Sequence, residues 1–269
     1  MALEIVVCVK QVPDPECGRE SLAIRKDGLA VEPRGLSPVL SPFDANALEA
    51  ALRVKEACAA GDARVTVLSV GRQIARVVVE TALAAGADRF VKVEDERFVA
   101  EQLDSFVTAS ILAAAMTKLG HCDLVLAGRQ AADWNAGQVG VGVAHLLGIP
   151  VVTLARRVDV DGTNTVVERL TGDGYERVRA PLPALVVVSN EVGELRYPGI
   201  AQRKAARSKP VVAWTAADVG FGTLPRRRLR LVELTSPEVR ATDCILVDGA
   251  DGADAGRRLA ERLHRDGVL

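Results

Sequence analysis

Short apolar runs alternate with stretches of helical periodicity along the first half of the chain. The runs cover residues 5–9, 65–70, 90–93 and 124–127 and are rich in Val, Leu and Ile, which is typical of strands buried on both faces. The stretches between and after them, at 43–58, 74–85, 105–119 and 139–147, repeat apolar residues with a helical period. Asp44 is placed to cap the first helix. This alternation predicts an α/β fold with a doubly wound, mainly parallel, Rossmann-like sheet.

Beyond residue 150 the pattern changes to shorter strands with turn signals. Strands are expected at 151–160, 165–170, 175–179 and 184–189, and Asp161-Gly162 is a hairpin signal, so antiparallel strands should return to the sheet. Residues 191–210 show no regular period. Residues 229–247 look extended and exposed, and a helix at 254–265 closes the chain. The pattern divides the chain into an α/β domain over 1–215 and an extended C-terminal arm over 216–269, which either wraps a partner or is a loose terminus.

Composition excludes several classes of function. The 269 residues are 49% hydrophobic but only 3% aromatic, so platforms for stacking nucleic-acid bases are not expected. The net charge of −1 provides no general attraction to nucleic acid or to anionic membranes. The five cysteines form no CxxC pair and no metal-ligand spacing with histidine, and no secretory segment begins the chain. We therefore expect a reduced, cytoplasmic protein without a metal site. We expect no catalytic residue, because the sequence contains no recognisable Ser/His/Asp set.

The stretch from Asp123 to Gly142 is the best candidate for binding chemistry. It contains a buried strand, a polar loop with Gly137, and a helix start with Gly140 and Gly142. Glycines let the backbone approach a phosphate, and free N–H groups at a helix start favour an anion. The spacing matches neither GxGxxG nor a P-loop, so a merely glycine-rich turn remains the alternative.

Two cations could meet such a phosphate. Lys10 follows the first strand and is either a phosphate ligand or a solvated strand end. Arg129 can hold a phosphate with two donors, or it can pair with Asp133. Cys8, inside the first strand, is expected to be a small core residue whose backbone lines the site.

Several motifs together resemble one family, firmly over residues 3–215 and loosely in the tail. They are Val9-Lys10-Gln11-Val12-Pro13-Asp14, Ser41-Pro42-Phe43-Asp44, the helix 46–52, Val67-Leu68-Ser69-Val70-Gly71, the segment 82–89, Gly128-Arg129-Gln130-Ala131-Ala132-Asp133, Gly137-Gln138-Val139-Gly140, Leu182-Pro183-Ala184-Leu185-Val186 and Arg196-Tyr197-Pro198. In this order and spacing the chain resembles the β subunit of electron transfer flavoprotein.

The resemblance implies an electron carrier rather than an enzyme. Its members form a heterodimer with an α subunit that carries FAD, and the β subunit holds AMP. They pass electrons from acyl-CoA dehydrogenase-type flavoenzymes, as in fatty acid β-oxidation, to a membrane quinone reductase. In a bifurcating branch the β subunit holds a second FAD that accepts hydride from NADH. A third hypothesis is a regulatory module that binds ATP and changes partners.

The resemblance also implies the site residues. The cofactor-binding residues are Cys8, Val9, Lys10, Ser41, Pro42, Phe43, Asp44, Val70, Gly71, Ala127, Gly128, Arg129, Gln130, Ala131, Asn135, Ala136, Gly137, Gln138, Val139 and Gly140. A recognition segment over about 191–210 contacts the partner flavoenzyme through Arg196, Tyr197 and Ile200, with a basic run over 203–209 beside it.

This chain departs from the family pattern at three places. Where members read something like Gly-Asp-Thr, it has Trp134-Asn135-Ala136, so backbone N–H groups and Asn135 must replace a threonine hydroxyl, and Trp134 either covers the nucleotide or reshapes the pocket. Pro15 stands where some members have a tyrosine. Ile200 falls on the leucine that anchors the partner dehydrogenase, and the polar residues after it suggest a different partner surface.

Overall fold

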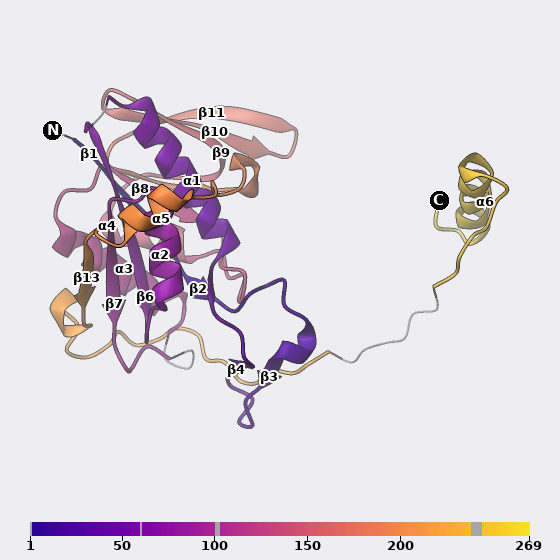
Figure 1. Cartoon of the computed structure of the whole chain (residues 1–269), viewed down its shortest axis with the longest axis horizontal. Helices are drawn as coiled ribbons and strands as arrows, with labels where there is room; N and C mark the ends of the chain where they lie inside the picture. The colour runs from indigo at the N-terminus through magenta and orange to yellow at the C-terminus, as the bar shows by residue number, and fades with distance from the viewer. Residues whose placement is uncertain (1, 60, 100–102, 238–243) are drawn as a thin grey trace. The chain divides into compact units, whose positions relative to one another are not determined.

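The computed structural model describes residues 2–59, 61–99, 103–237 and 244–269. It divides into two units, residues 1–234 and 235–269, and each is described by itself. The first unit contains every strand of the described chain, together with the helices that cover them (Figure 1).

A nine-stranded sheet forms the centre of the first unit. Its strands, in spatial order, are β11 (Gly174–Pro181), β10 (Asn164–Thr171), β9 (Val151–Asp161), β12 (Ala184–Val188), β8 (Leu124–Gly128), β1 (Leu3–Cys8), β6 (Ala63–Gly71), β7 (Arg89–Glu94) and β13 (Val211–Trp214). Neighbours pair in parallel from β9 to β13, whereas β10 is antiparallel to both β9 and β11. The expected α/β class with a mainly parallel sheet is confirmed.

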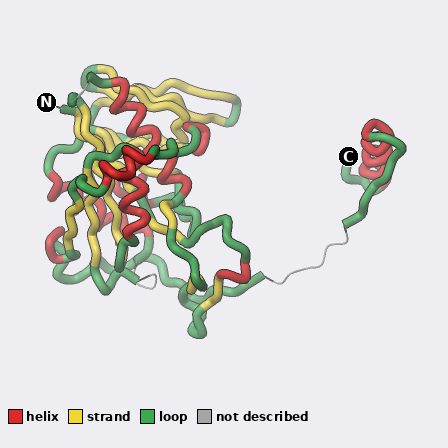
Figure 2. The backbone as a smooth tube through the Cα atoms, viewed as in Figure 1, coloured by secondary structure: helices red, strands yellow, loops and turns green. Residues whose placement is uncertain are grey.

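Helices cover both faces of the sheet (Figure 2). Successive residues of β1 point to opposite faces of the sheet, and both faces are buried: Ile5 and Val7 belong to one apolar cluster and Val6 and Cys8 to another. The first cluster includes α1 (Pro42–Ala57) and α2 (Arg76–Ala85), which lie nearer the viewer in Figure 1. The second includes α3 (Ser105–Leu119) and α4 (Val139–Leu147).

The strand order reverses between β1 and β8. The chain runs from β1 to β6 and β7 on one side and then returns to place β8 on the other side of β1. In open α/β sheets the crevice outside the carboxyl ends of the strands at such a reversal is where ligands bind. The fold therefore singles out the residues that follow β1 and β8.

The structure corrects three expectations about local structure. Helix α1 begins at Pro42 with Ser41 as its N-cap, so Asp44 lies inside the helix and is not the cap. The stretch expected to be irregular contains helix α5 (Ile200–Ala206), which packs beside α2, and β13 then extends the sheet. The loop after β1 contains two small antiparallel pairs. These are β2 (Gln11–Val12) with β5 (Val39–Leu40), and β3 (Leu22–Ile24) with β4 (Val31–Pro33).

Short 3₁₀ turns complete the first unit, at Arg19–Ser21, Asn190–Val192 and Ala217–Val219. The second unit contains helix α6 (Gly252–Arg265), close to the predicted range. Its N-cap Asp251 accepts a hydrogen bond from the Asp254 N–H at 2.8 Å. None of its residues is buried, and Leu259 is exposed on it. Across the described residues, no helix has the length and apolar character required to cross a bilayer.

Candidate functional site

The end of β1 and the start of α1 are joined by hydrogen bonds. The N–H of Lys10 donates to Oδ2 of Asp44 at 2.8 Å, and the N–H of Ser41 donates to the carbonyl of Lys10 at 2.9 Å. The first turn of α1 therefore lies directly against the carboxyl end of the central strand, where the strand order reverses.

The end of β8 meets the same helix turn. The N–H of Gly128 donates to Oδ1 of Asp44 at 3.2 Å. A Cβ atom added at Gly128 would lie 2.5 Å from the backbone carbonyl carbon of Phe43, closer than any real contact. Only glycine allows this approach, so the glycine that ends the apolar run has a steric role in the site.

Asp44 connects these elements through both of its carboxylate oxygens. Its side chain is buried, and burial raises its pKa to about 7 against the opposing effect of the hydrogen bonds from the N–H groups of Lys10 and Gly128. Sequence reasoning placed Asp44 in the site but gave it a capping role. The missing information was the tertiary position of two strand ends that are far from Asp44 in the sequence.

The loop after β8 contacts Lys10 through Asp133. The Lys10 ammonium lies 2.6 Å from Oδ2 of Asp133, so Asp133 pairs with Lys10 and not with Arg129. The Arg129 guanidinium lies over the Phe43 ring at 5.3 Å from its centre. Side chains also meet within the loop, where Nε2 of Gln130 donates to Oδ1 of Asn135 at 2.9 Å. Two cations thus lie at the strand ends, Lys10 after β1 and Arg129 in the loop after β8.

Backbone conformation explains the residues in the second half of this loop. Asn135 and Gly137 both have positive φ, 50° and 66°, and asparagine and glycine are the residues that tolerate it best. Trp134 is half exposed rather than covered by the rest of the chain. The loop then leads into α4, whose N-cap Gln138 makes no side-chain cap.

Gly140 in the first turn of α4 lies close to the sheet. An added Cβ would lie 3.0 Å from Cγ2 of Val187 and 3.3 Å from Cβ of Ala127, so the helix rests directly on the sheet. The sequence led us to expect a close approach of the Gly140 backbone to a phosphate, which remains a prediction, and the close contact in the structure is with the sheet.

Most of the predicted cofactor-binding residues gather at one edge of the sheet. Cys8, Val9 and Lys10 end β1, residues 41–44 begin α1, Ala127 and Gly128 end β8, residues 129–138 form the loop, and Val139 and Gly140 begin α4. Val70 and Gly71 end β6, the other neighbour of β1. Burial raises the pKa of the Cys8 thiol, which is consistent with a core residue.

One buried group at the site is unsatisfied. Oγ of Ser41 is buried and has no hydrogen-bond partner among the described residues, although this residue is the N-cap of α1. A hydroxyl in this position can donate to, or accept from, a polar group placed at the strand ends. Sequence reasoning also passed over Gln11, whose side chain bonds the carbonyl of Gln73 and the N–H of Ala75 and so ties the loop after β6 to the end of β1.

The predicted recognition residues behave in two ways. Tyr197 and Ile200 are 87% and 89% exposed, and Ile200 begins helix α5 instead of lying on a loop. Arg196 is held by Glu49 and Glu56 of α1. Among the described residues no group of His, Cys, Asp and Glu side chains could hold a metal ion.

The family model for the electron transfer flavoprotein domain matches residues 29–219, which include α1, the loop after β8 and the exposed pair Tyr197 and Ile200. The chain belongs to the electron transfer flavoprotein family. An electron transfer flavoprotein subunit beta from Clostridium acetobutylicum is 38% identical over 220 residues, covering 81% of this chain and 80% of the relative.

Two further relatives of the chain have other names. The caffeyl-CoA reductase-Etf complex subunit CarD of Acetobacterium woodii is 35% identical over 219 residues, covering 81% of this chain and 80% of the relative. Protein FixA of Azorhizobium caulinodans is 31% identical over 279 residues, covering 99% of this chain and 96% of the relative. The chain is thus a β-type subunit of the family, a flavoprotein component of electron transport.

Proposed function

We propose that this chain is the β subunit of a heterodimeric electron transfer flavoprotein of the cytoplasm. The α subunit carries FAD, and the heterodimer passes electrons from an acyl-CoA dehydrogenase-type flavoenzyme to a quinone reductase. FAD, when bound, accepts and releases those electrons. The chain itself contributes a folded platform, a nucleotide site and a surface for the partner flavoenzyme, and catalyses no reaction of its own. Its cysteines are free wherever the structure describes them, which suits a reducing compartment.

A structural AMP at the ends of β1 and β8 is the second part of the proposal. The observation that supports it most is that the Asp44 carboxylate accepts the N–H groups of both Lys10 and Gly128 and so joins two strand ends where the strand order reverses. Ligands of open α/β sheets bind outside the strand ends at such a reversal. The residues around it suit a phosphorylated ligand. They include the cations of Lys10 and Arg129 and the uncapped start of α4.

Arg129, Lys10 and the loop backbone each contribute different donors to the phosphate. Arg129 can offer two parallel donors to a phosphate, while the Lys10 ammonium has donors left after it pairs with Asp133. Backbone N–H groups over 136–140, with the side chain of Asn135, replace the hydroxyl that Ala136 lacks. A buried AMP would stabilise the folded state by mass action, since it binds only the folded chain.

The alternative is a bifurcating β subunit with a second FAD that accepts hydride from NADH. The similarity to a subunit of a caffeyl-CoA reductase complex favours testing it directly. The experiment is to denature the purified heterodimer and identify the released nucleotides by chromatography. We expect one AMP for each FAD. Two FAD and no AMP would establish the alternative, and release of ATP would point to a regulatory module instead.

A further inference from the structure

A buried carboxylate on α1 is the starting point. Glu49 lies in the middle of the helix and its side chain is only 6% exposed. A carboxylate removed from water needs charged or hydrogen-bonded partners, because burial alone strongly disfavours its ionised form. Burial does raise the pKa of Glu49, but hydrogen bonds from Arg196 and Arg53 outweigh it and hold the pKa below its usual value.

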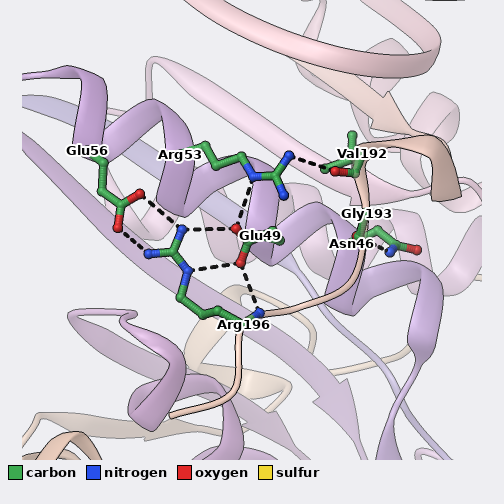
Figure 3. A network of polar contacts seen from close by, with 7 residues as sticks. All are labelled: Asn46, Glu49, Arg53, Glu56, Val192, Gly193 and Arg196. Carbon is green, nitrogen blue, oxygen red and sulfur yellow. Dashed lines mark hydrogen bonds and ion pairs between the residues drawn. The ribbon is translucent and has the colours of Figure 1, made fainter. Parts of the chain in front are cut away.

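Arg196 provides most of those partners (Figure 3). Its Nε and Nη2 donate to Oε2 and Oε1 of Glu49, both at 2.9 Å, and its backbone N–H donates to Oε2 at 3.1 Å. The other edge of the same guanidinium faces Glu56, with Nη2 at 3.0 Å from Oε2 and Nη1 bonded to Oε1. One arginine therefore bridges two carboxylates that lie two turns apart on one face of α1.

The residues just before Arg196 are fixed to the same helix. Nη1 of Arg53 donates to the carbonyl of Val192 at 2.7 Å, and Nδ2 of Asn46 donates to the carbonyl of Gly193 at 2.6 Å. Together with Arg196, these contacts form what we call the α1 clamp: Asn46, Glu49, Arg53 and Glu56 on the helix, with Arg196 on the segment that they hold.

The chain after the clamp is also held. Oε1 of Gln202 accepts the N–H of Gly199 at 2.8 Å, and the Arg203 guanidinium lies 4.8 Å from the centre of the Tyr197 ring. Further on, the Lys209 ammonium donates to the carbonyls of Leu83 and Ala87, at the end of α2. Between the two anchors, Tyr197 and Ile200 are almost completely exposed. Many interactions thus hold a segment whose two largest apolar side chains lie in water.

We propose that Arg196 is a positioning residue, which holds the segment 193–200 on α1 and so presents Tyr197 and Ile200 to the partner flavoenzyme without touching that partner. The inference rests on the proposed function for what the segment meets. Ordering a loop and its side chains opposes association, and a segment already ordered before binding avoids that loss. Loss of the clamp should therefore weaken docking and leave the electron-transfer step of the docked complex unchanged.

The test uses the intact heterodimer with a purified acyl-CoA dehydrogenase, reduced by its acyl-CoA, as the probe partner. The variants are Arg196→Gln, Arg196→Lys and Glu56→Gln. Glu56 is largely exposed, so its variant should fold even if a change at Arg196 does not. Lysine keeps the charge but not the fork that bridges two carboxylates, so it should rescue only in part. Arg64→Gln, which removes an exposed ion pair with Glu4, is the matched control.

Two readouts separate the possible results. For Arg196→Gln we expect faster amide hydrogen exchange over 194–201. We also expect the KM for the dehydrogenase to rise about three- to tenfold with kcat unchanged, because binding must then order a few residues that the wild type holds in place. Glu56→Gln should change both in the same direction but less. A raised KM with unchanged exchange in Arg196→Gln, or an unaffected Glu56→Gln, would mean that Arg196 touches the partner directly and would overturn the proposal.

The same experiment distinguishes failure of the proposed function. If Ile200→Ala leaves the KM unchanged, the segment does not dock this class of partner, and the proposed function is at fault. If Ile200→Ala raises the KM while exchange in Arg196→Gln stays slow, the partner surface stands and the positioning role of Arg196 is wrong.

Discussion

Asp44 and Gly128 lie 84 residues apart in the sequence, and one hydrogen bond of 3.2 Å joins them at the reversal of the sheet. Gly128 provides the N–H and the empty space, and Asp44 provides the acceptor from the first turn of α1. The second oxygen of Asp44 accepts the N–H of Lys10, so one side chain fixes two neighbouring strand ends. The geometry of the proposed nucleotide site depends on this arrangement.

Asp44→Asn should weaken nucleotide retention. Asparagine has one acceptor oxygen, so its amide NH₂ would face one of the two N–H donors and leave that donor buried without a partner. Such a loss typically destabilises by about 1–3 kcal/mol. The measurement is the AMP content of the heterodimer after gel filtration, with the melting temperature beside it. Asp62→Asn, in the exposed turn before β6, is the control and should change neither.

The stabilities of the wild type and of the Asp44→Asn variant should diverge with pH. The pKa of Asp44 is about 7 in the folded chain, above the usual value of 3.8, so the folded state keeps a proton that the unfolded state loses. As pH rises from about 4 to 7, the wild type should therefore lose stability relative to Asp44→Asn, by up to a few kcal/mol, at about 1.4 kcal/mol for each pKa unit. Denaturant melts at several pH values measure the difference. A difference that is constant across this range would contradict the buried, protonated carboxyl.

Gly128→Ala should displace α1 from the end of β8. The added methyl group would collide with the backbone of Phe43, and backbone cannot move aside as a flexible side chain can. Overpacking of this kind costs about 1–3 kcal/mol, and we expect loss of bound nucleotide as well. Gly172→Ala adds the same methyl group where nothing lies within 4 Å, so its melting temperature and AMP content should match those of the wild type.

Ile200→Ala should weaken reduction by the partner dehydrogenase and spare the fold. An exposed aliphatic side chain that becomes buried at an interface contributes about 1–3 kcal/mol to binding, whereas its exposure here means that the free chain loses little packing. Rates of flavin reduction, flavin content and melting temperature are measured on the same variant. A large fall in melting temperature with an unchanged rate would show that Ile200 supports its own domain.

Leu259→Glu should reduce assembly with the α subunit. None of the residues of helix α6 is buried within the second unit, so this unit leaves the apolar side chains of the helix uncovered. The first unit, which holds the sheet, should keep its melting temperature. Analytical ultracentrifugation of the two mixed subunits gives the dissociation constant. If the variant assembles as tightly as the wild type, α6 does not contribute to the heterodimer interface.

The sequence was most informative where local patterns decide the structure. The periods of α3 and α4 predicted their bounds to the residue, because apolar spacing and the glycines that follow them are local signals. Helix α5 and strand β13 were missed because each is short. β13 depends on pairing with β7, and α5 on packing beside α2.

The same limit applies to the candidate site. The glycine-containing loop after β8 was visible as a motif, since glycine and a helix start are local features. That Lys10 pairs with Asp133, and that Arg196 binds Glu49 rather than standing free, follows only from which elements the fold brings together. From the sequence alone, a charged side chain has many possible partners of opposite charge. The distances between residues in the folded chain decide which of them it pairs with.

Helix α1 carries Asp44 in its first turn and Glu49 in its second. One helix therefore fixes the position of the proposed nucleotide site relative to the α1 clamp. Each residue of an α-helix turns the next by about 100°. Deleting or inserting one residue between these two carboxylates would rotate Glu49 off the face that meets Arg196 while leaving Asp44 where it is. The spacing of five positions thus fixes the angle between the two carboxylates about the helix axis, so a change in the length of this turn should disrupt the α1 clamp even where every side chain of the clamp is kept.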